Sequence, residues 1–142
     1  TGLVGQHESL VSSALQSHDS FAIHPSGTRV LVAEIAPGER NEISLVDLEN
    51  SDRSSLFQGG LDVRWHPNGV DAIVLAPDRK EVNQLWQIST TEPTRQQQIT
   101  FLENGIESIG SLSIDGKTLL ATSGLNAASL LVMIDFDKIT TQ

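Results

Sequence analysis

Histidine is the side chain in this sequence best suited to acid–base or metal chemistry, and the chain has four: His7, His18, His24 and His66. His24 and His66 each precede a proline in similar surroundings, so we interpret both as turn residues whose imidazoles bond local backbone. The pair His7 and Glu8 lacks the second histidine, four positions on, that a zinc-protease helix requires. The chain has no cysteine, which excludes disulfides, thiolate zinc sites and cysteine nucleophiles.

Acidic side chains give a weaker signal. Segment 47–52 alternates carboxylate and amide oxygens as calcium loops do, but it lacks their sharp-turn glycine and terminal bidentate glutamate. We interpret it as a solvated turn, and Asp135 and Asp137 as exposed turn acids. The motifs of serine hydrolases, phosphate-binding loops and dinucleotide-binding loops are absent from the sequence. The sequence therefore predicts no catalytic, cofactor-binding or metal-binding residue, and we expect no enzyme activity, in particular no hydrolase activity.

The charge balance narrows the possible partners. Nine basic residues stand against 18 acidic ones, giving a net charge of −9 over 142 residues. A nucleic-acid surface needs a basic stripe, and an anionic membrane surface attracts cationic segments, so we expect neither contact for this segment. The longest apolar runs are about five residues, as at 130–134, whereas a membrane-spanning helix needs about 20. The sequence shows no signal peptide, and because it starts at Thr1 we expect a processed chain or a piece of a longer one.

Three segments repeat one pattern, and this repeat indicates the fold. Each has a short alternating strand, a turn ending in glycine, and then an apolar strand. The turn glycines are 42 and 47 residues apart, close to the period of about 40–45 residues of four-stranded propeller blades. Proline fixes φ in the first two turns, and glycine supplies a positive φ in all three. The turn residues we single out are His24, Pro25, Gly27, His66, Pro67, Gly69, Asp115 and Gly116.

The pattern predicts an all-β fold of about three four-stranded antiparallel blades that form an open, partial propeller. Apolar second strands suit burial on both faces, and polar fourth strands suit an outer edge that faces water. We assign blade 1 to 20–60, blade 2 to 61–104 and blade 3 to 105–142, preceded by a helix or outer strand at 1–19. Strands are expected near 20–24, 28–35, 42–48, 53–58, 62–66, 71–76, 83–89, 96–101, 110–114, 118–122 and 129–136, with a last polar strand near 139–141.

The two tryptophans lie at non-equivalent places in the second unit. Trp65 precedes the turn, and Trp86 lies in the third strand. We interpret both as packing residues of the core or of the contact between blades; the alternative is a contact on a recognition surface, where tryptophan is enriched. The sequence has no tyrosine and only four phenylalanines, so few aromatic side chains are available to line a small-molecule pocket. We expect no cofactor.

The repeat resembles the TolB-like branch of WD-repeat-like β-propellers. In that family each blade opens with a Ser/His-Pro-Asp-Gly turn, and the third strand often carries Leu/Ile-Trp/Tyr-x-Val/Ile. This sequence departs from the pattern because Ser26 and Asn68 replace the turn aspartate and Ile114 replaces a proline. The resemblance covers about residues 18–142 and is carried by segments 24–27, 66–69, 113–116 and 85–88.

The resemblance implies a binding or sensing segment of a larger bacterial protein. The first expectation is the extracytoplasmic, periplasmic sensory part of a CadC-type membrane-anchored transcriptional regulator. The alternatives are a propeller domain that accompanies a serine oligopeptidase and a TolB-like envelope scaffold that binds protein partners.

Three blades are too few to close a propeller, since known propellers have about 4–8. We therefore expect either a fragment or self-association through the open blade edges, or contact with another protein there. The third blade is the expected contact because its strand at 130–134, which contains Val132, is the most apolar run of the chain.

Overall fold

The computed structural model describes residues 20–34, 41–125 and 128–138. All eleven strands expected between residues 20 and 136 are present, which confirms the all-β prediction. The segments expected at 1–19 and 139–141 lie outside the described residues. The elements are β1 (Ser20–Ile23), β2 (Arg29–Glu34), β3 (Glu42–Asp47), β4 (Arg53–Gln58), β5 (Asp62–Trp65), β6 (Asp71–Pro77), β7 (Asn83–Ser89), β8 (Gln96–Gln98), β9 (Ser108–Leu112), β10 (Thr118–Leu125), β11 (Ala128–Asp135) and the short 3-10 helix η2 (Phe136–Lys138).

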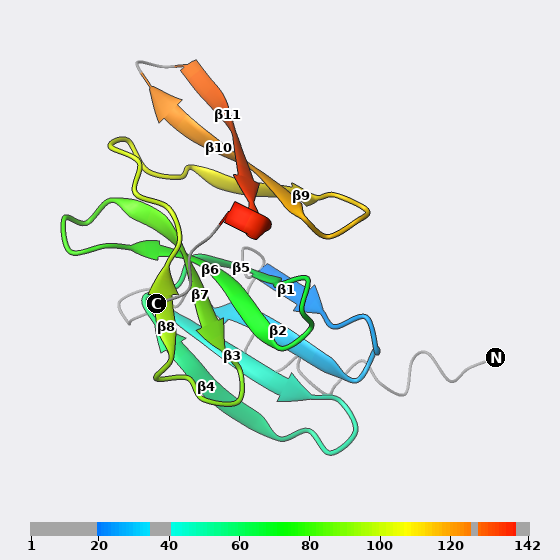
Figure 1. Cartoon of the computed structure of the whole chain (residues 1–142). Helices are drawn as coiled ribbons and strands as arrows, with labels where there is room; N and C mark the ends of the chain where they lie inside the picture. Colours follow the sequence, from blue (N-terminus) through cyan, green and yellow to red (C-terminus); the bar gives the residue numbers. More distant parts are fainter. Residues whose placement is uncertain (1–19, 35–40, 126–127, 139–142) are drawn as a thin grey trace.

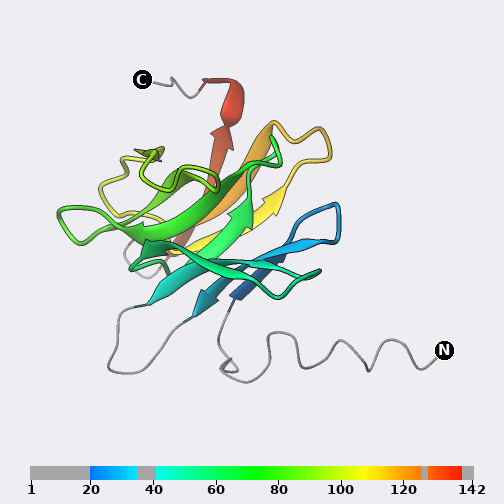
Figure 2. The same cartoon turned by 90° about the horizontal axis from the view of Figure 1, so that it is seen from below.

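The strands form three antiparallel sheets, each made of consecutive strands (Figure 1). The first contains β1 to β4, the second β5 to β8, and the third β9 to β11 within the described part of the chain. In every sheet the first strand lies at one edge and the strands follow in sequence order towards the other edge. The second sheet lies between the first and the third, as the view in Figure 2 also shows.

Apolar side chains fill the two spaces between successive sheets. One core cluster joins the first and second sheets, and another joins the second and third. Strand β6 serves both, with Val74 in the first cluster and Ile73 in the second. Successive side chains of a strand point to opposite faces, so one apolar run can fill two cores. This explains why segment 72–76 is buried without interruption.

The outermost strands of the first two sheets have a different character. Strand β4 is exposed at its first three residues, and β8 consists of three glutamines. Water covers the free edge of such a strand, and polar side chains discourage pairing with another chain. Composition thus changes from apolar to polar along each of these sheets, from the middle strands to the outer edge.

The three repeat turns share one backbone geometry. His24 N–H donates to Arg29 O (2.8 Å), and Gly27 N–H donates to His24 O (2.8 Å). The turns that begin at His66 and Ser113 repeat both hydrogen bonds at 2.8 and 2.9 Å. The turn glycines have φ values of 76°, 72° and 72°, a left-handed conformation that glycine adopts at no steric cost. The third turn therefore keeps its shape without a proline.

Candidate binding surface

The first two turns contact each other through His24. Its Nδ1 accepts a hydrogen bond from Ser26 N–H (3.0 Å), and its Nε2 lies 2.9 Å from Gly69 O. A carbonyl oxygen only accepts, so Nε2 must carry the proton and the ring is the Nε2–H tautomer. The imidazole thus bonds its own turn, as the sequence predicts, and also the turn of the next sheet, which the sequence did not predict.

Trp65 also contacts the first sheet from the second, beside His24. Its Nε1–H donates to Ala22 O (2.8 Å), and its ring meets His24 edge to face at 4.7 Å between centroids. The Arg29 guanidinium carbon lies 5.2 Å from the Trp65 ring centroid, a cation–π distance. Trp65 is therefore held on several sides by the first sheet.

The second and third turns meet through different atoms. A Cβ placed on Gly116 would lie 3.0 Å from Cβ of Pro67, so only glycine fits there without displacement. His66 accepts a hydrogen bond at Nδ1 from Asn68 N–H (3.0 Å), and its ring lies 4.6 Å from that of Phe136 in η2. Burial lowers the pKa of His66 below its ordinary value, although the Asp71 carboxylate acts in the opposite direction.

A groove runs beside these turns across the first strands of all three sheets, and we call it the inner groove. Its volume is about 330 Å³. Phe21 and Ile23 of β1 and Leu112 of β9 are exposed at its walls, and Arg64 and Trp65 of β5 lie between them. Apolar side chains exposed together in a concave surface are typical of a binding site.

Arg64 is the charged residue of the inner groove. Its guanidinium donates to Asp62 Oδ1 and to Val63 O, both at 2.8 Å, and more weakly to Ile109 O of the third sheet at 3.4 Å. Asp62 also accepts a hydrogen bond from the Ser20 hydroxyl. This network fixes the arginine at the point where the three first strands converge.

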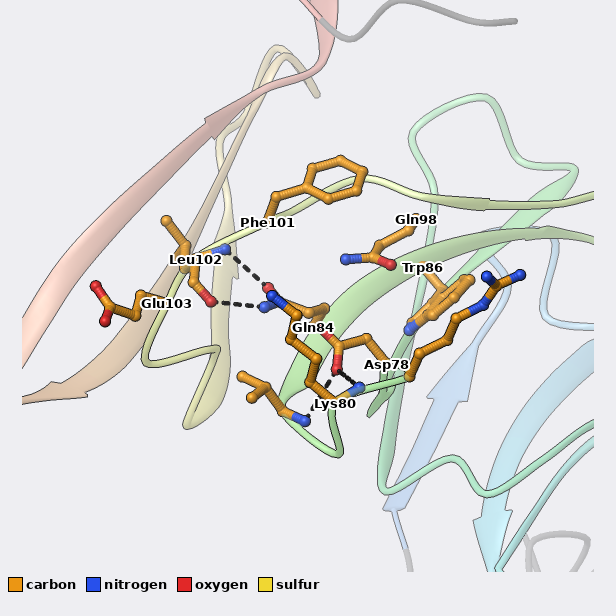
Figure 3. A pocket seen from close by; sticks show the side chains of 10 residues that line it. Asp78, Lys80, Gln84, Trp86, Gln98, Phe101, Leu102 and Glu103 are labelled. Atoms are coloured by element: carbon orange, nitrogen blue, oxygen red, sulfur yellow. Dashed lines mark hydrogen bonds between the residues drawn. The ribbon is translucent and has the colours of Figure 1, made fainter.

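A larger pocket of about 760 Å³ lies on the outer side, between the β6–β7 hairpin and the chain that follows β8 (Figure 3). Asp78 Oδ1 accepts the backbone N–H groups of Lys80 and Val82 and so shapes the hairpin. The Gln84 side chain donates to Leu102 O (2.7 Å) and accepts from Leu102 N–H (3.3 Å). These polar groups hold the hairpin and the crossing chain together.

Trp86 lines this outer pocket and belongs to the packing as well. Its Nε1–H donates to Ala76 O (3.1 Å), and its ring lies 6.3 Å from that of Phe57 across the first core cluster. The exposed Phe101 lines the same pocket. Trp86 therefore packs against the core, in agreement with the first interpretation from sequence, and also lines a surface pocket, whereas a role in recognition stays a prediction.

The acidic candidates stabilise turns. Asp47 Oδ1 accepts Glu49 N–H (2.8 Å), and Asn50 Oδ1 accepts Asp52 N–H (2.9 Å). Asp135 Oδ1 accepts the N–H of the residue two positions on, Asp137, at 3.0 Å. Within residues 20–34, 41–125 and 128–138, no group of three or more His, Cys, Asp or Glu gathers as a metal site. His7 and His18 lie outside these residues.

Val132 faces the second core cluster, against which it packs, whereas its neighbours Leu131 and Met133 point outward. A role of Val132 in an interaction stays a prediction. The same described ranges contain no helix long and apolar enough to cross a membrane.

Stacked antiparallel sheets whose first strands converge on one side define the β-propeller fold, and the chain forms an open, partial propeller. No family model and no curated protein matches the chain. Solved structures do. TolB from Acinetobacter baumannii is 21% identical with a TM-score of 0.70, over 89% of this chain and 31% of that one. The putative TolB from Agrobacterium tumefaciens is 16% identical with a TM-score of 0.73, over 91% and 49%.

The β-propeller domain of the Trilobed protease from Pyrococcus furiosus is a third similar structure, 16% identical with a TM-score of 0.58, over 85% of this chain and 41% of that one. The chain thus spans less than half the length of each of these three proteins. At such identities the likeness establishes the fold.

Sequence reasoning expected Trp65 to pack in the core or between blades, but it missed that His24 and Arg64 also connect the sheets. The contacts of His24 with Gly69 and of Arg64 with Ile109 join positions 45 residues apart. The equal spacing of these two pairs is close to one repeat, so the repeat length itself was the signal that could have suggested them.

Proposed function

We propose that this chain is a non-catalytic binding segment of a larger bacterial protein and that it recognises its partner at the inner groove. One observation carries the proposal: the first strands of the first and third sheets expose apolar side chains on either side of Trp65, around one concave surface. Soluble proteins rarely leave such side chains gathered and uncovered unless they bind something.

The chemistry beside the groove supports binding over catalysis. Both ring nitrogens of His24 are engaged in hydrogen bonds, so this imidazole is not available as a general base. The His66 ring packs against Phe136 and accepts a backbone N–H. We therefore predict that the chain hydrolyses neither ester nor peptide substrates. Turnover that is lost on replacing one serine or histidine of this chain would contradict the prediction.

For the biological setting, we propose the periplasmic sensory part of a membrane-anchored transcriptional regulator. The resemblance of the repeat to TolB-like propellers, which also occur in the periplasmic parts of CadC-type regulators, supports this choice, and the likeness to TolB structures supports an envelope protein. A second candidate is a propeller domain that accompanies a peptidase, favoured by the likeness to the Trilobed protease propeller. A TolB-like scaffold is the third.

The binding proposal can be tested by selecting a displayed random-peptide library against the chain. Peptides that bind should lose most of their affinity when Ile23→Asp or Leu112→Asp places a charge on the groove wall. The matched control is Phe101→Asp, which changes an exposed apolar residue of the outer pocket. Selected peptides that bind all three variants equally well would contradict recognition at the inner groove.

The setting is tested separately by the coding sequence that adjoins this segment. A winged-helix domain and one membrane span upstream would support the regulator, and a hydrolase domain downstream would support the peptidase. A signal peptide alone would support the scaffold.

A further inference from the structure

The third sheet differs from the other two at its outer edge. In the first two sheets the third strand is covered on its far side by β4 or β8, whereas within the described residues β11 is the last strand of its sheet. Figure 1 shows β11 in orange and red at the border of the molecule. Backbone N–H and C=O groups that point away from β10 form an edge that another strand can pair with.

The composition of β11 is that of an interior strand. From residue 128 to residue 134 it carries no charge, and Leu131 and Met133 are 69% and 70% exposed. Strand β4, by contrast, carries an arginine, two serines and a glutamine, and β8 consists of glutamines. Natural edges are usually blunted by charge or proline, so a strand of eight residues, about 26 Å long, with no charge before its last residue indicates a strand-shaped occupant.

We propose that the occupant is β11 of a second copy, paired antiparallel about a two-fold axis at Val132. In this register Leu131 lies opposite Met133 of the other copy, and Leu130 lies opposite Ile134. Each pair joins apolar residues on the same face of the sheet. Ser129 lies opposite Asp135, so a hydroxyl can donate to the carboxylate. The strand is thus complementary to itself, as a two-fold contact requires.

Charge near the edge does not oppose the contact. Lys138 lies 3.9 Å from Asp135, and Lys117 lies 3.9 Å from Asp137, so the acidic residues at the end of β11 have basic neighbours. The net charge of −9 on each copy is distributed over the rest of the chain. Salt screens such long-range repulsion over about 8–10 Å and leaves apolar contact intact, so salt should favour the dimer.

Light scattering of the 142-residue chain over a range of concentrations tests the proposal. We expect the mass to rise from 15.3 kDa towards twice that value, at lower concentration when salt is added. Leu131→Lys and Met133→Lys change exposed side chains, so the fold should survive. The dissociation constant of the dimer should rise at least tenfold in each variant. The matched control is Ser55→Lys on the edge of β4, which should leave the dimer unchanged.

A second variant tests the register and does not depend on weakening the contact. The chain has no cysteine, so Val132→Cys introduces a single thiol, which would lie beside its counterpart across the two-fold axis, on the face of the sheet that packs on the second core cluster. Directly opposed strand residues have Cα separations of about 4.5–5.5 Å, which suits a disulfide. Mild oxidation should give a covalent dimer with this variant and not with Ser55→Cys. A chain that stays monomeric at high concentration and high salt, or a dimer that survives both lysine variants, would overturn the proposal.

Discussion

The imidazole Nε2 of His24 lies 2.9 Å from the carbonyl oxygen of Gly69, 45 residues further along the chain. This hydrogen bond joins the turn of one sheet to the turn of the next, at a point where Trp65 meets the same imidazole edge to face. One histidine thus stabilises its own turn and sets the spacing between two sheets.

Replacing His24 with alanine should therefore destabilise the fold beyond a local turn effect. We expect a loss of about 1–2 kcal/mol in the free energy of unfolding, from the hydrogen bonds to Gly69 and Ser26 and from one ring contact. Urea unfolding followed by Trp fluorescence measures it. Ser26→Ala removes only local bonds of the same turn and should cost less than about 0.5 kcal/mol. Equal losses for the two variants would show that the contact between turns contributes nothing.

Alanine substitutions at Gly105 and Gly27 separate the cost of backbone strain at positive φ from the cost of steric crowding by a new Cβ. Both have positive φ values, 68° and 76°. A Cβ on Gly105 would lie 2.5 Å from Asn83 O and 2.6 Å from Val82 Cγ1, whereas nothing lies within 4 Å of one on Gly27. Gly27→Ala should cost about 1–2 kcal/mol from strain alone, and Gly105→Ala about 2–5 kcal/mol. Denaturant midpoints of the two variants give the comparison, and similar midpoints would contradict it.

Gln84 is a buried amide whose bonds hold β7 to the chain after β8. Besides Leu102, it accepts a hydrogen bond from the Thr100 hydroxyl at 2.8 Å. Gln84→Met should cost about 2–4 kcal/mol, because it leaves buried polar groups without partners. Combining it with Thr100→Val should cost less than the sum of the single changes, which a double-mutant cycle of unfolding free energies measures. Strict additivity would show that the two side chains do not interact.

The pKa of His66 predicts a dependence of stability on pH. Burial lowers it in the folded chain, so below the ordinary value of 6.5 the unfolded chain binds more protons than the folded one. Stability should therefore be complete above this value and should fall as the pH decreases from 6.5 towards the folded pKa. Thermal melts between pH 7.5 and pH 5 should show this slope, and His66→Gln should reduce it. An unchanged slope in the variant would assign the effect to other groups.

The strand pattern could be predicted because alternation and apolar runs depend on neighbouring residues. Its errors at strand ends come from contacts between residues that are distant in sequence. Strand β8 ends at Gln98 and not at 101, because the Thr100 hydroxyl accepts the N–H of Leu85 in place of a backbone partner. Strand β10 runs on to Leu125 past polar residues, because Ser123 finds a partner in Gly105 O. Both effects need atoms distant in sequence.

The binding surface was less predictable. The turns were found from proline and glycine, yet the inner groove depends on which strands converge. Phe21, Ile23 and Leu112 look like ordinary members of alternating strands in the sequence. Only the stacking of the sheets shows that they face one groove.

In each contact between successive turns, the glycine of the later turn meets a ring of the earlier turn. The two ends of the series of turns are therefore not equivalent. Gly69 receives the imidazole of His24, and Gly116 receives the ring of Pro67. The third turn begins with Ser113 followed by Ile114, so it has no ring to offer a further glycine in the same way. Longer arrays engineered from this chain should therefore be extended by duplicating the first or second unit, with the third kept at the end.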